Sequence, residues 1–186
     1  MLKLIVFVAF SAGLVYVSRA SLRAPRSHGF YRFFAWESIL SLFFLNFENL
    51  EQWFRDPFSI RQLVSWFLLL ASLVPFALGV HQLRTLGRPD TQRRGDVPLI
   101  GIEKTTQLVT TGVYKYIRHP LYSSLFLLAW GVFLKNPSWA GGCLAIGTTA
   151  FLLATVKVEE EENIRYFGPA YQAYIRETKM FIPFFF

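Results

Sequence analysis

Residues 112–122 form a polar, aromatic stretch whose side chains could bind a ligand. The stretch ends where a long apolar run begins. It holds a cation, an imidazole and three phenol rings, in Arg118, His119, Tyr114, Tyr116 and Tyr122. Pro120 restricts His119 to an extended backbone and fits the first turn of a following helix, so we expect a stiff turn. The same residue types are also ordinary anchors at a membrane interface, and composition alone leaves both interpretations open.

A run of four glutamates at residues 159–162 is the second stretch suited to chemistry. We interpret it as a charged helix start, where carboxylates stabilise the helix dipole; this benefit is lost if the preceding helix continues through it. Successive side chains on a helix point in different directions, so all four cannot face one site. We expect Glu159 and Glu160 in the site, whereas Glu161 forms a favourable pair with Arg165 one turn later.

Cysteine and histidine usage argues against a metal site. Cys143 is the single cysteine, which excludes an intramolecular disulfide. The three histidines, His28, His81 and His119, do not share the spacing of metal ligands. We therefore predict no metal.

Composition indicates the class of protein that must position these stretches. Apolar residues make up 53% of the sequence, and mean hydropathy is +0.36. This is too apolar for an ordinary soluble domain, so we predict an all-α integral membrane protein with a single domain over residues 1–186. The formal net charge of +7 is not arranged as a basic stripe with interleaved aromatics. We therefore predict the lipid bilayer as a partner and no nucleic acid.

Apolar runs predict about five transmembrane helices. They cover residues 2–18, 33–47, 62–80, 121–134 and 139–158. Residues 1–82 are then membrane scaffold, 83–119 a cytoplasmic loop with the first polar stretch, and 120–186 a helical hairpin with a tail helix. A small-residue face at Gly141, Ala145 and Thr149 favours close packing of that hairpin. The hairpin places both polar stretches on the same side of the membrane.

Two features within this scaffold leave alternatives open. Residues 83–111 are too long for a plain connection, so we expect a lid or a substrate-facing loop, with a solvated linker as the alternative. Glu37 lies within a predicted span, where an acid is costly and usually faces the bundle or a cavity. Its alternative is a position near the interface, paired with Arg32 or Arg26.

Charge distribution predicts the orientation. With five spans, 15 lysines and arginines fall on one side of the membrane and four on the other. Positive residues favour the cytoplasm, so the amino terminus is predicted outside and both polar stretches inside. We predict a multi-pass protein of a bacterial inner membrane.

The two polar stretches resemble the paired signature of the isoprenylcysteine carboxyl methyltransferase and phospholipid methyltransferase superfamily. Its first half is Gly-x-Tyr and then Arg-His-Pro-x-Tyr before a membrane helix, as in residues 112–122. Its second half is a Glu-Glu pair followed by Phe-Gly-x-x-Tyr-x-x-Tyr, as in residues 159–174. The resemblance covers about the last 80 residues well.

The resemblance implies S-adenosylmethionine as the cofactor and a membrane lipid or lipophilic acceptor as substrate. A cationic sulfonium with an ammonium and a carboxylate calls for carboxylates, a cation and aromatic faces. The implied cofactor-binding residues are Tyr114, Tyr116, Arg118, His119, Pro120, Tyr122, Glu159 and Glu160. An isoprenylcysteine-like carboxylate acceptor needs no base, whereas an amine or thiol must lose a proton. Glu160 is the candidate for base or substrate orientation, and Arg118 and Arg176 are candidates for holding an anionic group.

Two other functions fit the same sequence. A sterol-reductase-like membrane enzyme shares a similar carboxyl-terminal half but binds NADPH. A non-enzymatic membrane interaction protein that kept the fold is the other alternative.

Overall fold

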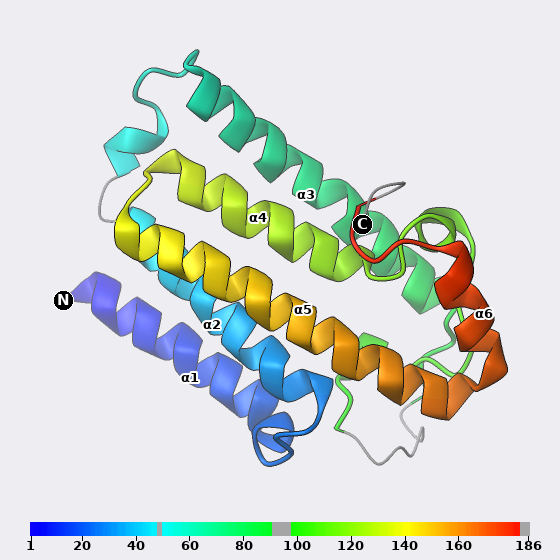
Figure 1. Ribbon diagram of the computed structural model, residues 1–186. Coiled ribbons are helices and arrows are strands. Elements are labelled where there is room, and N and C mark those ends of the chain that lie inside the picture. The colour runs from blue at the N-terminus through cyan, green and yellow to red at the C-terminus, as the bar shows by residue number, and fades with distance from the viewer. Residues whose placement is uncertain (48–49, 91–97, 183–186) are drawn as a thin grey trace.

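The computed structural model describes residues 1–47, 50–90 and 98–182, and all regular secondary structure in these ranges is helical. Five helices lie side by side in a bundle, and a short sixth helix lies at one end of it (Figure 1). The bundle consists of α1 (Leu2–Leu22), α2 (His28–Phe47), α3 (Ile60–Thr85), α4 (Pro120–Lys135) and α5 (Trp139–Phe167). The sixth helix is α6 (Pro169–Glu177), and single 3-10 turns are η1 (Leu50–Trp53), η2 (Gly101–Glu103) and η3 (Gly112–Lys115).

The helices follow the predicted apolar runs. Helices α1, α3 and α5 are long and apolar enough to cross a membrane, and α4 is a shorter apolar helix. That all five cross stays a prediction. Helix α1 extends to Leu22 and α2 begins at His28, so most of the polar segment expected between the first two runs is helical.

Helix α5 corrects one expectation. It runs without a break from Trp139 to Phe167, so no helix begins at the glutamates and their predicted benefit from the helix dipole does not exist. Glutamate is a good helix former, and nothing at residues 158–159 interrupts the backbone hydrogen bonds. The helix ends instead at Gly168, whose φ of +62° favours glycine, and Pro169 then begins α6.

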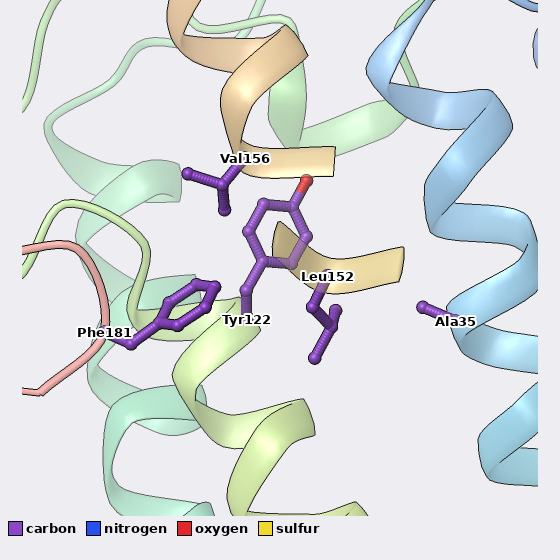
Figure 2. Packing of buried hydrophobic residues seen from close by; sticks show 5 residues of the cluster. All are labelled: Ala35, Tyr122, Leu152, Val156 and Phe181. Carbon is purple, nitrogen blue, oxygen red and sulfur yellow. The ribbon is translucent and has the colours of Figure 1, made fainter. Parts of the chain in front are cut away.

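Packing pairs α3 with α4 and α2 with α5 most extensively. Gly141 and Ala145 are buried as the small-residue face predicted, and Trp130 Nε1 of α4 donates to Thr149 Oγ1 at 3.1 Å across the hairpin. A core cluster lies between the helices (Figure 2), and in it Tyr122 of α4 projects toward α5. The cluster comprises Ala35, Tyr122, Leu152, Val156 and Phe181.

Candidate functional site

The turn that precedes α4 is held on both sides. Gly112 has a φ of +62°, and Gln82 Oε1 of α3 accepts from the next backbone N–H, that of Val113, at 3.1 Å. The segment after α6 pairs with the turn through backbone hydrogen bonds between residues 116–119 and 179–180. His119 caps α4 with a φ of −124°, and Pro120 is the helix's first residue. Pro120 therefore stands in the first turn of the helix as predicted, whereas the His119 ψ of 62° lies outside the extended region that was expected.

The two polar stretches meet at this turn, as the hairpin predicted. Arg118 Nε donates to Glu160 Oε1 at 2.7 Å, and the same oxygen lies 3.2 Å from His119 Nε2. The Tyr122 hydroxyl donates to Glu159 Oε2 at 2.6 Å. Neighbouring glutamates of one helix thus contact different residues of the first stretch.

A cavity of about 240 Å³ lies against these contacts. The predicted site residues that line it are Tyr114, Arg118, His119, Pro120, Tyr122 and Glu159. Glu160 is not in the lining and instead contacts Arg118 and His119. Tyr116 is 49% exposed and Arg176 is also exposed; neither lines the cavity. The structure therefore brings together seven of the nine predicted residues, six in the lining and Glu160 through its contacts, and leaves Tyr116 and Arg176 outside.

Three phenol rings from two segments form what we call the tyrosine cluster, which comprises Tyr114, Tyr171 and Tyr174. The Tyr174 hydroxyl donates to the Tyr114 carbonyl at 2.6 Å, and all three rings line the cavity. Burial raises the pKa of each hydroxyl well above its ordinary value, and the charge of Glu159 raises the pKa of Tyr114 and Tyr171 further. The cluster therefore stays neutral at physiological pH.

A second buried network, which the sequence did not predict, joins α2, η2 and α5. His28 donates its backbone N–H to Glu162 Oε1 at 3.0 Å, and its Nδ1 lies 2.5 Å from Glu162 Oε2. On the other side, Glu103 forms ion pairs with Arg32 and with His28 Nε2. Arg32 and Glu103 line the cavity. The only signal in the sequence was the spacing of His28 and Arg32 one helical turn apart.

Residues 98–109 of the predicted substrate-facing loop contribute much of the cavity wall. Its lining residues there are Ile100, Ile102, Glu103, Thr105, Gln107, Leu108 and Val109. Residues 91–97 of the same loop lie outside the described residues. Glu103 Oε2 also accepts from the Ile100 backbone N–H at 3.0 Å. The ion pairs of Glu103 therefore fasten this part of the loop to α2.

Glu37 lies elsewhere. Its carboxylate accepts from Ser11 Oγ of α1 at 2.9 Å, and it is not among the cavity lining. Arg32 pairs with Glu103 instead, so the suggested pairing of Glu37 with Arg32 is wrong. In the described part of the chain, no group of three or more His, Cys, Asp or Glu side chains could hold a metal ion.

Comparison with known proteins gives matches to part of the chain. Residues 90–170 match the family model for phospholipid methyltransferases. A methanethiol S-methyltransferase of Crocosphaera subtropica is 33% identical over 75 residues, which cover 40% of this chain and 29% of the relative. Methanethiol S-methyltransferase 2 of Bradyrhizobium diazoefficiens is 34% identical over 94 residues, covering 49% and 35%.

A relative with a different named activity is similar over a comparable length. The protein-S-isoprenylcysteine O-methyltransferase of Dictyostelium discoideum is 32% identical over 80 residues, which cover 41% of this chain and 32% of the relative. The matches thus span about a third of the length of these relatives. No solved structure matches the chain.

Proposed function

We propose that the protein is a membrane methyltransferase of the superfamily of phospholipid and isoprenylcysteine carboxyl methyltransferases, because residues 90–170 match the phospholipid methyltransferase family model and relatives of both kinds are similar to the chain. It uses S-adenosylmethionine and methylates a lipophilic acceptor. Both bind in the cavity between the turn before α4, the end of α5 and the loop at residues 98–109.

The charge of the cavity wall carries this proposal. Two arginines face four glutamates in and directly behind the wall, so these groups sum to −2 when the nearby histidines are neutral. The residues are Arg32, Arg118, Glu103, Glu159, Glu160 and Glu162. S-adenosylmethionine carries a sulfonium, an ammonium and a carboxylate, a net positive charge that this wall favours. NADPH is a polyanion, and the same carboxylates repel its phosphates.

The side chains of the wall suit the parts of this cofactor. The faces of the tyrosine cluster can contact a cation or stack on a flat ring. Glu159 presents a carboxylate to the cavity, held by the Tyr122 hydroxyl. Arg118, which also lines the cavity, and Glu160 hold the turn in place. When bound, the cofactor supplies an activated methyl group; the protein aligns the two reactants and excludes water, which contributes on the order of 7 to 11 kcal/mol.

Apolar side chains from three bundle helices support a lipophilic acceptor. They are Trp36 of α2, Phe76 of α3, and Leu121 and Leu125 of α4. Phe76 lines the cavity and is also 52% exposed on a helix that is long and apolar enough to cross the membrane. The cavity therefore extends toward the lipid-facing surface, and the acceptor enters sideways from the bilayer. The excess of positive residues on this side of the bundle supports a cytoplasmic site.

Calorimetric binding to the purified protein in nanodiscs tests the proposal. We expect S-adenosylmethionine and its demethylated product to bind at micromolar concentration, and NADPH not to bind. Glu159→Gln removes a cavity carboxylate and weakens binding at least tenfold. Glu161→Gln is the matched control, because Glu161 is exposed on the same helix, and it leaves binding unchanged. A folded protein that binds NADPH, or that binds no S-adenosylmethionine at millimolar concentration, refutes the proposal.

A further inference from the structure

Arg32 of α2 carries hydrogen-bond donors that no other group of the described chain uses. Its side chain is 1% exposed and lines the cavity. A guanidinium only donates, and its Nε and Nη2 atoms hold three of its five N–H groups. Within the described ranges neither atom has a hydrogen-bond partner. Buried donors without a partner are costly, so their presence on a cavity-lining side chain indicates a place for a ligand atom that accepts.

The remaining nitrogen of the guanidinium is anchored. Nη1 forms the ion pair with Glu103 of η2 and lies 3.4 Å from His28 Nε2. His28 is in turn fixed to α5, because its Nδ1 and its backbone N–H both contact Glu162. Three segments of the chain therefore hold the Nη1 end of Arg32 in place, and the Nε and Nη2 edge is left for another partner.

The guanidinium lies where the charged wall of the cavity meets its apolar wall. Arg32 Cζ is 4.7 Å from the centroid of the Trp36 ring, one turn further along α2. Trp36 belongs to the apolar lining that suits the acceptor. The tyrosine cluster and Glu159, which suit the donor, come from η3, α5 and α6 instead. The unused donors of Arg32 therefore belong to the part of the wall that faces the acceptor.

Charges around Arg32 determine which group of an acceptor fits. Glu103 already compensates the charge of Arg32, and Glu160 compensates that of Arg118, the other arginine of the lining. An anionic group would therefore meet the carboxylate of Glu159 without a cation left to balance it, and it is repelled. An uncharged carbonyl oxygen has two lone pairs and adds no charge, so it can accept from both Nε and Nη2.

We propose that Arg32 is a specificity-determining residue and that its Nε and Nη2 groups bind an uncharged carbonyl oxygen of the acceptor. The planar fork holds the two N–H groups parallel, and the Trp36 ring packs against it. A site built to donate to an oxygen rejects an analogue that lacks it, because its donors then stay unpaired. The inference rests on the proposed methyl transfer, which it deepens by naming a group that the acceptor carries besides the methylated atom.

The first test needs no turnover. Protein labelled with nitrogen-15 arginine is placed in nanodiscs of ether-linked lipids, so that the bilayer itself brings no carbonyl group. The spectrum of Arg32→Lys lacks the Arg32 Nε–H signal and thereby identifies it. We expect 2-pentadecanone to move this signal and to slow its hydrogen exchange, whereas pentadecane does neither. The Nε–H signal of Arg23, an exposed residue at the end of α1, is the control and does not move.

The second test measures retention of the two radiolabelled probes by immobilised nanodiscs, after subtraction of what empty nanodiscs retain. The wild type binds the ketone at least about tenfold more tightly than the alkane, because the ketone alone pairs with the buried donors. Arg32→Lys keeps the charge opposite Glu103 but loses the fork, so it binds both probes equally. Its calorimetric affinity for S-adenosylmethionine stays that of the wild type. Arg23→Lys is the matched control and keeps the preference for the ketone.

Each other outcome refutes a different statement. If the wild type binds the ketone no better than the alkane, water fills the Arg32 donors and the inference fails without any variant. If tetradecanoate binds more tightly than the ketone, the subsite takes an anion and the inference fails. If S-adenosylmethionine alone moves the Arg32 signal and Arg32→Lys loses donor affinity, Arg32 serves the donor and its assignment to the acceptor is wrong. A folded wild type that binds the ketone but no S-adenosylmethionine refutes the proposed function and leaves the carbonyl subsite standing.

Discussion

Arg118→Lys tests whether one guanidinium holds the turn before α4 in place. Arg118 is 8% exposed and donates to three acceptors from two other segments: Glu160 Oε1 at 2.7 Å, the Ile175 carbonyl at 3.2 Å and the Thr178 carbonyl. A lysine ammonium is compact and lacks the planar fork, so it reaches one of these groups and leaves two. Each lost hydrogen bond to a charged group costs at least about 1.5 kcal/mol, or about 3 kcal/mol for two.

The assay for this variant is thermal unfolding in nanodiscs combined with donor calorimetry. A loss of about 3 kcal/mol lowers the melting midpoint by roughly 6–12 °C in a domain of this size. Donor affinity falls as well, because the turn carries His119 and Tyr114. Arg165→Lys, at an exposed position of α5, is the control and melts as wild type. If Arg118→Lys melts within 2 °C of wild type and only donor binding is lost, Arg118 contacts the ligand, and the reasoning is wrong.

Three further predictions follow from single features. Gly112→Ala places a side chain at a φ of +62° and against Gln82, so it lowers the free energy of unfolding by about 1–2 kcal/mol. Gly147→Ala adds a methyl group in α5 with no atom within 4 Å, so it raises the free energy of unfolding by about 0.5–1 kcal/mol. Thermal unfolding checks both changes. The tyrosine cluster has raised pKa values in the folded state, so its contribution to stability is complete below about pH 10 and is lost as pH rises toward those values. Melting temperatures measured up to pH 12 check this, and a melting temperature that does not change with pH contradicts it. Glu103→Gln removes the charge that pairs with Arg32, costs about 1.5–3 kcal/mol and makes residues 98–109 easier to cleave; limited proteolysis checks this, and unchanged cleavage contradicts it.

The sequence predicted the helices and the meeting of the two polar stretches because both depend on local patterns. Apolar runs predicted the five bundle helices, three of which are long and apolar enough to cross a membrane, and a short connection at residues 136–138 made the last two adjacent. Pro120 identified the start of α4 because its ring fits a helix's first turn. These signals lie within a few residues of the feature that they specify.

The second buried network could not be predicted in the same way. His28 and Glu162 are 134 positions apart, and Glu103 belongs to a loop without periodicity. Arg32 read as one member of a polar segment, yet it is 1% exposed because Glu103 compensates its charge. A buried charge of this kind depends on a tertiary partner, and a single sequence does not reveal which partner the fold supplies.

The continuity of α5 explains why the four glutamates have different roles. Each residue turns the side chain by about 100°, so neighbours diverge and residues three apart return to one face. Glu159 lines the cavity and Glu162 binds His28 on the adjoining side, while Glu160 points to Arg118 and His119 and Glu161 is exposed. The Glu-Glu pair therefore points in two directions from one helix: the first carboxylate faces the cavity, and the second contacts Arg118 and His119. Because α5 is unbroken, its packing in the bundle also fixes the direction in which each glutamate points. A separate helix beginning at residue 159 would not be oriented by that packing.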